Sequence, residues 1–362
     1  MTKIYALGSN GNYQLGIGHC KDIVEPHLSF DASRGNVKRI ACGGNHTMLL
    51  LEDGSLYGCG DNSRDQLSPN AGCTHWKEWK SIQNDIFKDV ACGWDFTAVI
   101  NEDDEVLTRG SGLKGELGLG NEQRESKEWK RVMTVSNKSK IFATLHNCVV
   151  VQPYLSGSKV YGWGSNTKCQ LFEPKCRIIS RPELTYESED VVIDYVAMGK
   201  DFLIYVDVRG RIVKATGCLP AAFKAEKWAP IENLLVRCMW TSVHILVTKN
   251  STQDTPKGIY SFGNNSHGQL FDEKELELPL DIKAFTTGSE HGIIGYRTDN
   301  ADRTVVACWG WGEHGNCGKF KNSDSSNSGT PLNEIFSWAK NVNAENIHLF
   351  GGCATTWIAQ DE

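Results

Sequence analysis

Several short segments of the chain place an aromatic or charged residue directly after a glycine, within one recurring local pattern. Three of them contain Trp94-Asp95, Lys200-Asp201 and Ser289-Glu290, and a fourth, related segment contains Trp240. In protein interfaces an aromatic side chain commonly anchors the partner, while neighbouring charges select it. These residue types therefore predict a protein-binding surface.

A second aromatic segment, from Trp309 to Gly315, places two tryptophans and an adjacent glutamate and histidine in a glycine-rich turn. Two interpretations stay open. The tryptophans could pack between structural units and leave the Glu-His pair in solvent, or the turn could extend the binding surface. The residues predicted to contact a partner are Trp94, Asp95, Lys200, Asp201, Trp240, Glu290, Trp311, Glu313 and His314.

Catalytic and metal-binding motifs find little support in the sequence. The 13 cysteines are scattered from Cys20 to Cys353 and never form a Cys-x-x-Cys pair, so neither a disulfide framework nor a zinc ribbon is indicated. Serine-hydrolase, zincin and phosphate-loop motifs are absent. Gly110-Ser-Gly112-Leu-Lys-Gly115 spells a dinucleotide-binding pattern, but no helix is expected to follow it. We predict no enzymatic activity, no cofactor and no metal ligands.

The elements that would position the candidate residues follow from an internal repeat. Gly8-x-Asn10-x-x-x-Gln14-Leu15 recurs in full at Gly60, Gly164 and Gly263, and weaker copies keep the same frame. The anchoring glycines are spaced 46 to 54 residues apart, which indicates a repeat architecture of seven units. They lie at positions 8, 60, 110, 164, 217, 263 and 310.

A second motif alternates with the first and also has seven copies. Good copies span 40–47, 90–97, 196–202 and 285–292, and degenerate ones span 142–151, 236–247 and 349–358. A short apolar run and a turn separate each good copy from the next first motif, which is typical of a β-hairpin. Because a small sheet cannot bury both of its faces alone, seven such sheets are expected to pack around a ring.

The repeats predict an all-β fold, a single seven-bladed β-propeller over residues 1–362. The chain begins with a first-motif strand at about residues 3–9 and ends with a second-motif strand at about 348–359. We expect these two strands to pair in one blade and close the ring. The fifth unit lacks the Asn and Gln-Leu positions, so the region from Thr216 to Ala229 is expected to be irregular.

Most repeated residues are interpreted as structural. The glycines permit positive φ or close backbone approach, the asparagines cap turns, and the Gln-Leu pairs hold loop backbone and fill space between blades. His46 and His291 share a repeat position that is phenylalanine in two other units, so we expect partly buried, hydrogen-bonded histidines.

Composition limits the classes of ligand. The 362 residues carry a net charge of −6, the wrong sign for bulk nucleic-acid binding, and no apolar run is long enough to cross a membrane. The segment from Lys127 to Lys140 is rich in lysine and contains Trp129, but its interleaved Glu and Ser favour a solvated loop between blades over RNA contact. No secretory signal is recognised at the start, so an intracellular protein is expected.

The alternating motifs resemble the regulator of chromosome condensation repeat family along essentially the whole chain. Segments such as 160–171, 196–202, 309–318 and 351–357 more narrowly resemble a fungal branch of that family, which is associated with α-tubulin suppression and killer-toxin insensitivity. The broader resemblance implies a propeller that is a scaffold for binding on its rims.

The narrower resemblance implies a non-enzymatic cofactor in the cytoplasm and nucleus. Its implied partner is the small CSL-type zinc-ribbon protein of diphthamide synthesis, bound as a heterodimer. Through that partner it would support Elongator-dependent modification of the tRNA wobble uridine and diphthamide modification of translation elongation factor two, with Elongator contacted only indirectly and no direct contact with nucleic acid or membrane. The alternative function is guanine nucleotide exchange on a small GTPase, as implied by the founding member of the family. A microtubule or cell-cycle link is a third possibility without support from particular residues.

Overall fold

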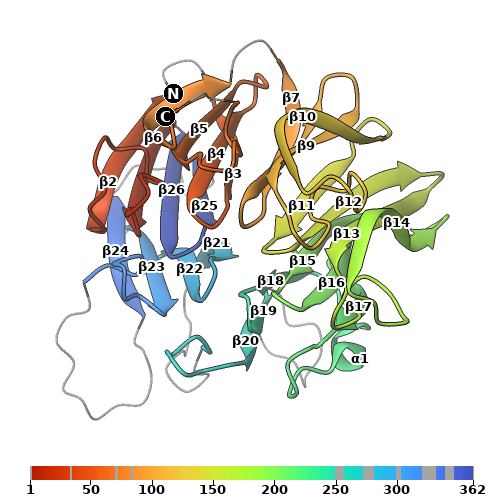
Figure 1. The fold of residues 1–362 in the computed structure, drawn as a ribbon. Coiled ribbons are helices and arrows are strands. Elements are labelled where there is room, and N and C mark those ends of the chain that lie inside the picture. The colour runs from red at the N-terminus through yellow and green to blue at the C-terminus, as the bar shows by residue number, and fades with distance from the viewer. Residues whose placement is uncertain are drawn as a thin grey trace.

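The computed structural model describes residues 2–32, 35–69, 72–82, 85–248, 257–271, 281–298, 303–319, 332–338 and 346–361. Seven antiparallel sheets stand around a central channel and form a closed β-propeller (Figure 1). In each blade the innermost strand lines the channel. The predicted fold class is therefore confirmed.

The first three blades each contain four strands. From the channel outwards they are, for blade 1, β3 (Val37–Cys42), β4 (His46–Leu51), β5 (Leu56–Asp61) and β6 (His75–Ile82); for blade 2, β7 (Phe87–Cys92), β8 (Phe96–Asn101), β9 (Glu105–Ser111) and β10 (Glu125–Thr134); and for blade 3, β11 (Lys140–Thr144), β12 (Asn147–Tyr154), β13 (Gly157–Ser165) and β14 (Ile178–Ser188).

Among the described residues, blades 4 and 5 have three strands and blade 6 has four. They are, for blade 4, β15 (Ile193–Met198), β16 (Phe202–Asp207) and β17 (Ile212–Gly217); for blade 5, β18 (Leu234–Cys238), β19 (Ser242–Val247) and β20 (Gly258–Gly263); and for blade 6, β21 (Asp281–Thr287), β22 (His291–Arg297), β23 (Thr304–Gly310) and β24 (Asn333–Trp338).

Blade 7 joins the two ends of the chain. Its strands are β25 (Ile347–Gly351), β26 (Thr355–Asp361), β1 (Thr2–Gly8) and β2 (Ile23–Ala32). β1 pairs with β26 without a register shift, from Thr2 opposite Asp361 to Gly8 opposite Thr355. This pairing confirms that N- and C-terminal strands close the ring.

Blade 4 is irregular in the predicted region. After β17 the chain forms the short helix α1 (Ala225–Trp228) instead of a fourth strand. Trp228 at its end packs edge-on against Tyr260 of the next blade, with ring centroids 5.1 Å apart. The helix therefore fills the space between blades 4 and 5.

The segment Lys127–Lys140 was expected to be a solvated loop between blades. This was wrong for residues 127–134, whereas residues 135–139 do form the connection between blades 2 and 3. Residues 125–134 form strand β10, the outermost strand of blade 2. Trp129 lies on its inward side, where the Arg109 guanidinium stacks over the indole ring at 4.0 Å. Packing of this aromatic residue against the blade outweighs the high charge of the segment.

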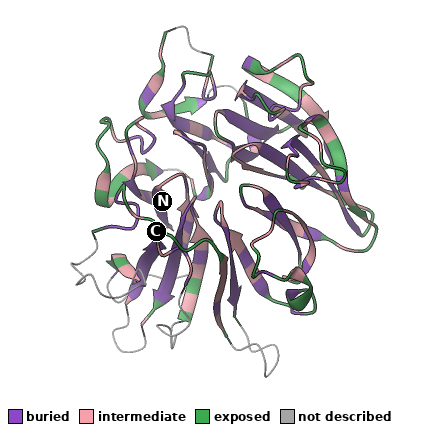
Figure 2. Ribbon diagram, turned by 60° about the horizontal axis from the view of Figure 1, so that its bottom comes forward, coloured by how far each residue is buried: buried purple, intermediate pink, exposed green. Residues whose placement is uncertain are grey.

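The core lies between neighbouring sheets, as the buried strands of Figure 2 show. β4, β16 and β19 are buried along their whole length because each is covered by the blades on both sides. Trp163 and Trp309 lie near the ends of the equivalent strands β13 and β23 and are fully buried. Their indole N–H groups donate to the carbonyls of Glu116 (2.7 Å) and Gln269 (2.9 Å) in the preceding blade, so each tryptophan joins two blades.

The seven anchoring glycines all have a left-handed backbone, with φ between +89° and +135°. At Gly110 a Cβ atom would lie 2.3 Å from the carbonyl oxygen of Asp95, in the turn between β7 and β8. The following amide, Ser111 N–H, donates to that same carbonyl at 2.9 Å. Glycine is therefore required because it allows both the φ value and the close approach.

The asparagine and glutamine of the first motif organise the loop that follows. The Asn62 side chain accepts from the amide of Leu67 (2.9 Å) and donates to the carbonyl of Ser68 (2.9 Å). Gln66 accepts from the amide of Arg64 at 2.9 Å. Asn166 and Gln170 repeat this arrangement, which confirms the structural interpretation of the motif.

We predict that Gly110→Ala lowers the free energy of unfolding by about 3 kcal/mol, because it combines left-handed strain with a backbone clash. Gly11→Ala is the matched control. Gly11 lies in the loop after Gly8, the repeat equivalent of Gly110, and a Cβ at Gly11 meets no atom within 4 Å. Urea denaturation followed by tryptophan fluorescence measures both variants. Equal stabilities for the two would contradict the proposed role of the anchoring glycine.

Candidate functional site

The turns that follow the innermost strands meet at one end of the channel. Backbone hydrogen bonds between these turns link five of the seven blade pairs. They are Gly44 N–H to Trp94 O (3.0 Å), Trp94 N–H to Leu145 O (3.1 Å), Lys200 N–H to Trp240 O (2.8 Å), Trp240 N–H to Ser289 O (2.8 Å) and Ser289 N–H to Gly352 O (2.9 Å). We call this end the narrow mouth, defined by residues 43–44, 93–94, 144–145, 199–200, 239–240, 288–289 and 352–353.

Two tryptophans from different blades lie next to each other at the narrow mouth. The rings of Trp94 (blade 2) and Trp240 (blade 5) have centroids 6.0 Å apart and are tilted by 52°. The cavity beneath them has a volume of about 130 Å³, against about 930 Å³ at the other end of the channel. Trp94 remains 37% exposed. The pair therefore presents aromatic surface to solvent at the centre of this face.

Glu290 lies beside this aromatic pair and is largely buried. Its carboxylate accepts hydrogen bonds from the Thr241 hydroxyl (3.0 Å) and the Gln269 amide (3.2 Å). Burial raises the pKa of Glu290, although these hydrogen bonds and the charges of His267 and Lys200 favour its ionised form. Glu290 and the exposed Lys200 therefore supply opposite charges on the same face.

Trp311 continues the surface from Glu290. Its amide donates to the Glu290 carbonyl at 2.9 Å, and its ring stacks on His267 with centroids 4.5 Å apart. Trp311 is 38% exposed, whereas Trp309 is buried, so one tryptophan of the segment packs between blades and the other reaches the surface.

Asp95 follows Trp94. It lies near three other titratable side chains from blades 1 to 3: Asp61, Glu116 and His146. Burial raises the pKa of the half-buried Asp95 carboxyl, and the charges of Asp61 and Glu116 raise it further. Glu116 is itself bonded to His146, with Oε1 and Nδ1 2.9 Å apart. Neither His146 nor Glu116 was predicted from the sequence as part of the binding surface. The repeat could have predicted His146, because His146 occupies the Asp95 position in the degenerate copy of the second motif over residues 142–151.

Glu313 and His314 contact other parts of this chain: Glu313 bonds to Trp311, and His314 bonds to Asp22. Glu313 accepts a hydrogen bond from the indole of Trp311 (3.1 Å). His314 Nδ1 lies 2.9 Å from Asp22 Oδ2, in the loop before β2 of blade 7. His314 is exposed, but this contact ties blade 6 to blade 7 away from Trp94 and Trp240. The structure therefore brings Trp94, Lys200, Asp201, Trp240, Glu290 and Trp311 onto one continuous face. Asp95 adjoins Trp94 on the part of this face that blades 1 to 3 form.

His46 and His291 are fully buried, so the expectation of partial burial was wrong. Their Nε2 atoms lie 3.0 Å from Thr97 Oγ1 and 2.9 Å from Thr356 Oγ1, in the next blade in each case. Within the described residues, neither Nδ1 atom has a hydrogen-bond partner. Burial lowers the pKa of both imidazoles to about 4. These uncharged side chains join blades.

The described residues contain no group of three or more His, Cys, Asp or Glu arranged to hold a metal ion. Cys42 and Cys353 lie near the narrow mouth, where burial raises the pKa of their thiols to about 12 and about 11. Thiols held in the protonated form are poor nucleophiles and poor metal ligands. Within the same ranges, no helix has the length and apolar composition needed to cross a bilayer.

Comparison with known proteins identifies the repeats. Family models for the regulator of chromosome condensation (RCC1) repeat match residues 3–50 and 37–66. An RCC1 repeat-containing protein of Schizosaccharomyces pombe is 27% identical over 99% of both chains. Residues 3–66 therefore match the RCC1 repeat, and the similarity to the yeast protein extends along the chain. The crystal structure of Prp20p from Saccharomyces cerevisiae shares the fold, with a TM-score of 0.68 and 16% identity over 99% of this chain and 91% of that one.

A shorter match concerns a protein with a named activity. The secretion-regulating guanine nucleotide exchange factor of Bos taurus is 40% identical over 65 residues, which is 18% of this chain and 14% of the exchange factor. This similarity covers little more than one repeat unit.

The buried histidines predict a pH dependence of stability. Their pKa is about 4 in the folded chain and near 6.5 when unfolded, so the unfolded state binds protons first as the pH falls. Each histidine should therefore cost about 2 kcal/mol of stability between pH 7 and pH 5.

The double variant His46→Phe/His291→Phe should lose most of this dependence in urea denaturation at pH 5, 6 and 7. Phenylalanine fits at this repeat position, as Phe96 and Phe202 show. His27→Gln, at an exposed site, serves as the control and should behave as the wild type does. An unchanged slope in the double variant would exclude these histidines as its source.

Proposed function

We propose that this RCC1-repeat protein is a non-enzymatic binding subunit whose narrow mouth holds a small protein partner. The observation that supports this most is the contact between Trp94 and Trp240, two tryptophans from blades that are not adjacent. They form a partly exposed aromatic centre surrounded by Lys200, Glu290 and Asp95. Interfaces are commonly built in this way, with central aromatic residues and a charged periphery.

The carboxyls at this face suit a partner with basic side chains. Burial raises the pKa of both Asp95 and Glu290, so each carboxylate is less well solvated in the free protein than it would be in water. A lysine or arginine of a partner would favour the ionised form and form a charge-assisted hydrogen bond. The face therefore combines aromatic contact area with acidic groups that gain a counter-charge on binding.

The partner we propose is the small CSL-type zinc-ribbon protein of diphthamide synthesis, bound as a heterodimer. The proposal rests on the resemblance of the repeats to the fungal branch described above. Through this partner the chain would support Elongator-dependent modification of the tRNA wobble uridine and diphthamide modification of translation elongation factor two, in the cytoplasm and nucleus. A small partner on one propeller face should bury about 1,200–2,000 Å² in total.

Guanine nucleotide exchange on a small GTPase is the second candidate function. It is supported by the 65-residue similarity to the bovine exchange factor, which is confined to a short segment. The two functions differ in a direct assay, because an exchange factor accelerates nucleotide release at substoichiometric concentration, whereas a binding subunit does not.

We predict that Trp94→Ala and Trp240→Ala each weaken binding of the purified zinc-ribbon partner by about 2 kcal/mol, or roughly 30-fold in Kd. Isothermal titration calorimetry measures the affinity, and melting temperatures establish that the ring stays folded. Leu155→Ala is the matched control, since Leu155 is 72% exposed in the β12–β13 turn at the opposite end of the blade.

Unchanged affinity in both tryptophan variants would place the partner on another surface. Absence of binding by the wild-type protein, together with accelerated nucleotide release from a small GTPase, would support the exchange function instead.

A further inference from the structure

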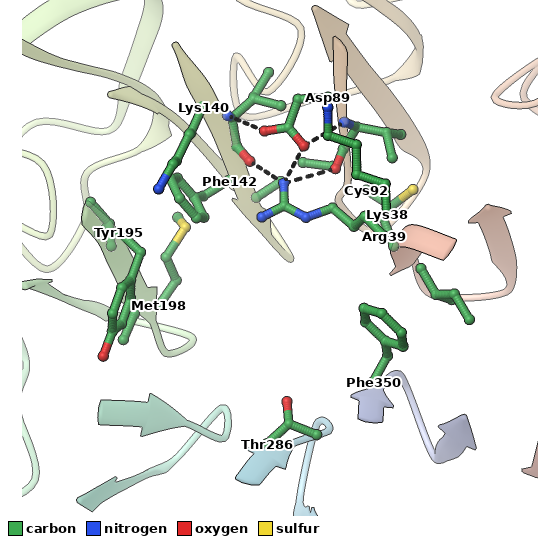
Figure 3. A pocket seen from close by; sticks show the side chains of 18 of the residues that line it. Lys38, Arg39, Asp89, Cys92, Lys140, Phe142, Tyr195, Met198, Thr286 and Phe350 are labelled. Atoms are coloured by element: carbon green, nitrogen blue, oxygen red, sulfur yellow. Dashed lines mark hydrogen bonds and ion pairs between the residues drawn. The ribbon is translucent and has the colours of Figure 1, made fainter. Parts of the chain in front are cut away.

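The opposite end of the channel opens into a cavity of about 930 Å³, within the range of ligand-binding pockets. It is lined by the innermost strands and by residues 137–139 of the loop before β11 (Figure 3). We call this end the wide mouth, defined by residues 38–41, 88–91, 137–143, 194–197, 236–237, 286 and 349–350. It shares no candidate contact residue with the narrow mouth.

The wide mouth is strongly basic in a chain whose net charge is −6. Two of its lining residues are acidic, Asp89 and Asp194, and six are basic: Lys38, Arg39, Lys88, Lys138, Lys140 and Arg237. Five of the six basic residues come from blades 1 to 3, so they form an arc on one side of the cavity. A concave surface of one charge concentrates counter-ions of the opposite sign.

Some of these cations are already engaged in the framework. Arg39 bridges three blades, because its guanidinium lies 2.7 Å from Asp89 Oδ1 and donates to the carbonyls of Val90 (3.2 Å) and Ile141 (2.9 Å) (Figure 3). Lys140 pairs with Asp194 at 2.6 Å. Lys88 pairs with Asp104 at 2.7 Å. These contacts hold the basic arc in place.

The other three basic side chains can still form ion pairs with a ligand. Within the described ranges, Lys38, Lys138 and Arg237 have no carboxylate at ion-pair distance. Lys38 and Lys138 are exposed at the mouth. Arg237 is half-buried on the far side, where its guanidinium lies over the Tyr195 ring at 5.1 Å and one N–H donates to the carbonyl of Val236. Charged donors in a concave site favour an anionic ligand.

Apart from Asp194 and Arg237, the lining residues from blades 4 to 7 are uncharged. Tyr195 and Met198 lie on one side of the cavity and Phe350 lies across it, with Thr286 between them (Figure 3). Aromatic and thioether side chains of this kind contact apolar or aromatic groups favourably. A ligand complementary to the whole cavity therefore carries several negative charges together with apolar side chains.

We propose that the wide mouth binds an acidic peptide segment of a partner protein, with glutamates or aspartates on the basic arc and aromatic residues against Tyr195 and against Phe350. A peptide fits better than a nucleic acid because the cations converge inside a well, whereas backbone phosphates are contacted along an extended surface. The wide mouth already contains lysine–carboxylate and arginine–carboxylate ion pairs, as Lys140–Asp194 and Arg39–Asp89 show. An acidic peptide would form ion pairs of the same kind.

The test uses the full-length protein and a fluorescein-labelled octapeptide of six glutamates and two phenylalanines. Fluorescence anisotropy should show saturable binding, and an octapeptide with glutamine at the six positions should not bind. Lys38→Gln/Lys138→Gln/Arg237→Gln should weaken binding by about tenfold or more. Lys168→Gln/Lys175→Gln/Lys224→Gln removes the same charge from exposed sites outside the cavity and should leave the affinity unchanged.

Equal weakening by the two triple variants, or no binding of the glutamate peptide, would overturn the proposal. Displacement of the peptide by a 15-nucleotide oligothymidylate at lower concentration than by unlabelled peptide would overturn it in favour of nucleic acid. Affinity for the zinc-ribbon partner, measured on the same variants, should not change. Failure at this site is thereby distinguished from failure of the function proposed for the narrow mouth.

Discussion

The structure depends on one contact that occurs seven times. At the end of each strand that carries a first-motif glycine, the glycine lies so close to the neighbouring turn that a Cβ atom would be 2.1 to 2.7 Å from a turn carbonyl. The amide after the glycine donates to that carbonyl, as Ser111 does to Asp95 and Trp311 does to Glu290. This contact fixes the turn next to the channel relative to the loop outside it, and so fixes Asp95, Glu290 and Trp311.

The repeated backbone allows the two ends of the channel to differ in chemistry. At the narrow mouth the turns are joined by hydrogen bonds between blades, so their side chains are free to vary without loss of the ring. One position is glycine in blade 1, tryptophan in blades 2 and 5, and lysine in blade 4. At the wide mouth the strands begin further apart, and ion pairs such as Arg39 with Asp89 hold them instead.

The sequence was sufficient to predict the fold because each blade is specified locally. Glycine, asparagine and glutamine act on their own turn, as Asn62 and Gln66 show, so the number of motif copies gives the number of blades. The pairing of β1 with β26 followed from the order of the motifs at the chain ends. The common face of Trp94, Lys200, Trp240 and Glu290 was predicted for the same reason.

Contacts between side chains of different blades were not predictable in this way. The meeting of Trp94 and Trp240 depends on the diameter of the ring, which no motif encodes. His314 is positioned by Asp22, almost the whole chain away, and the burial of His46 depends on Thr97 of the next blade. Residues 127–134 were misassigned because their charges suggested a loop, while the packing of Trp129 on Arg109 holds a strand.

Hydrogen–deuterium exchange of the chain with and without the proposed zinc-ribbon partner tests the central claim most directly. The claim is that the narrow mouth is the partner-binding face. We expect slower amide exchange on binding in segments 93–96, 199–202, 239–242 and 289–292, with no change in 137–141 at the wide mouth. Protection confined to the wide mouth or to the outermost strands would contradict it.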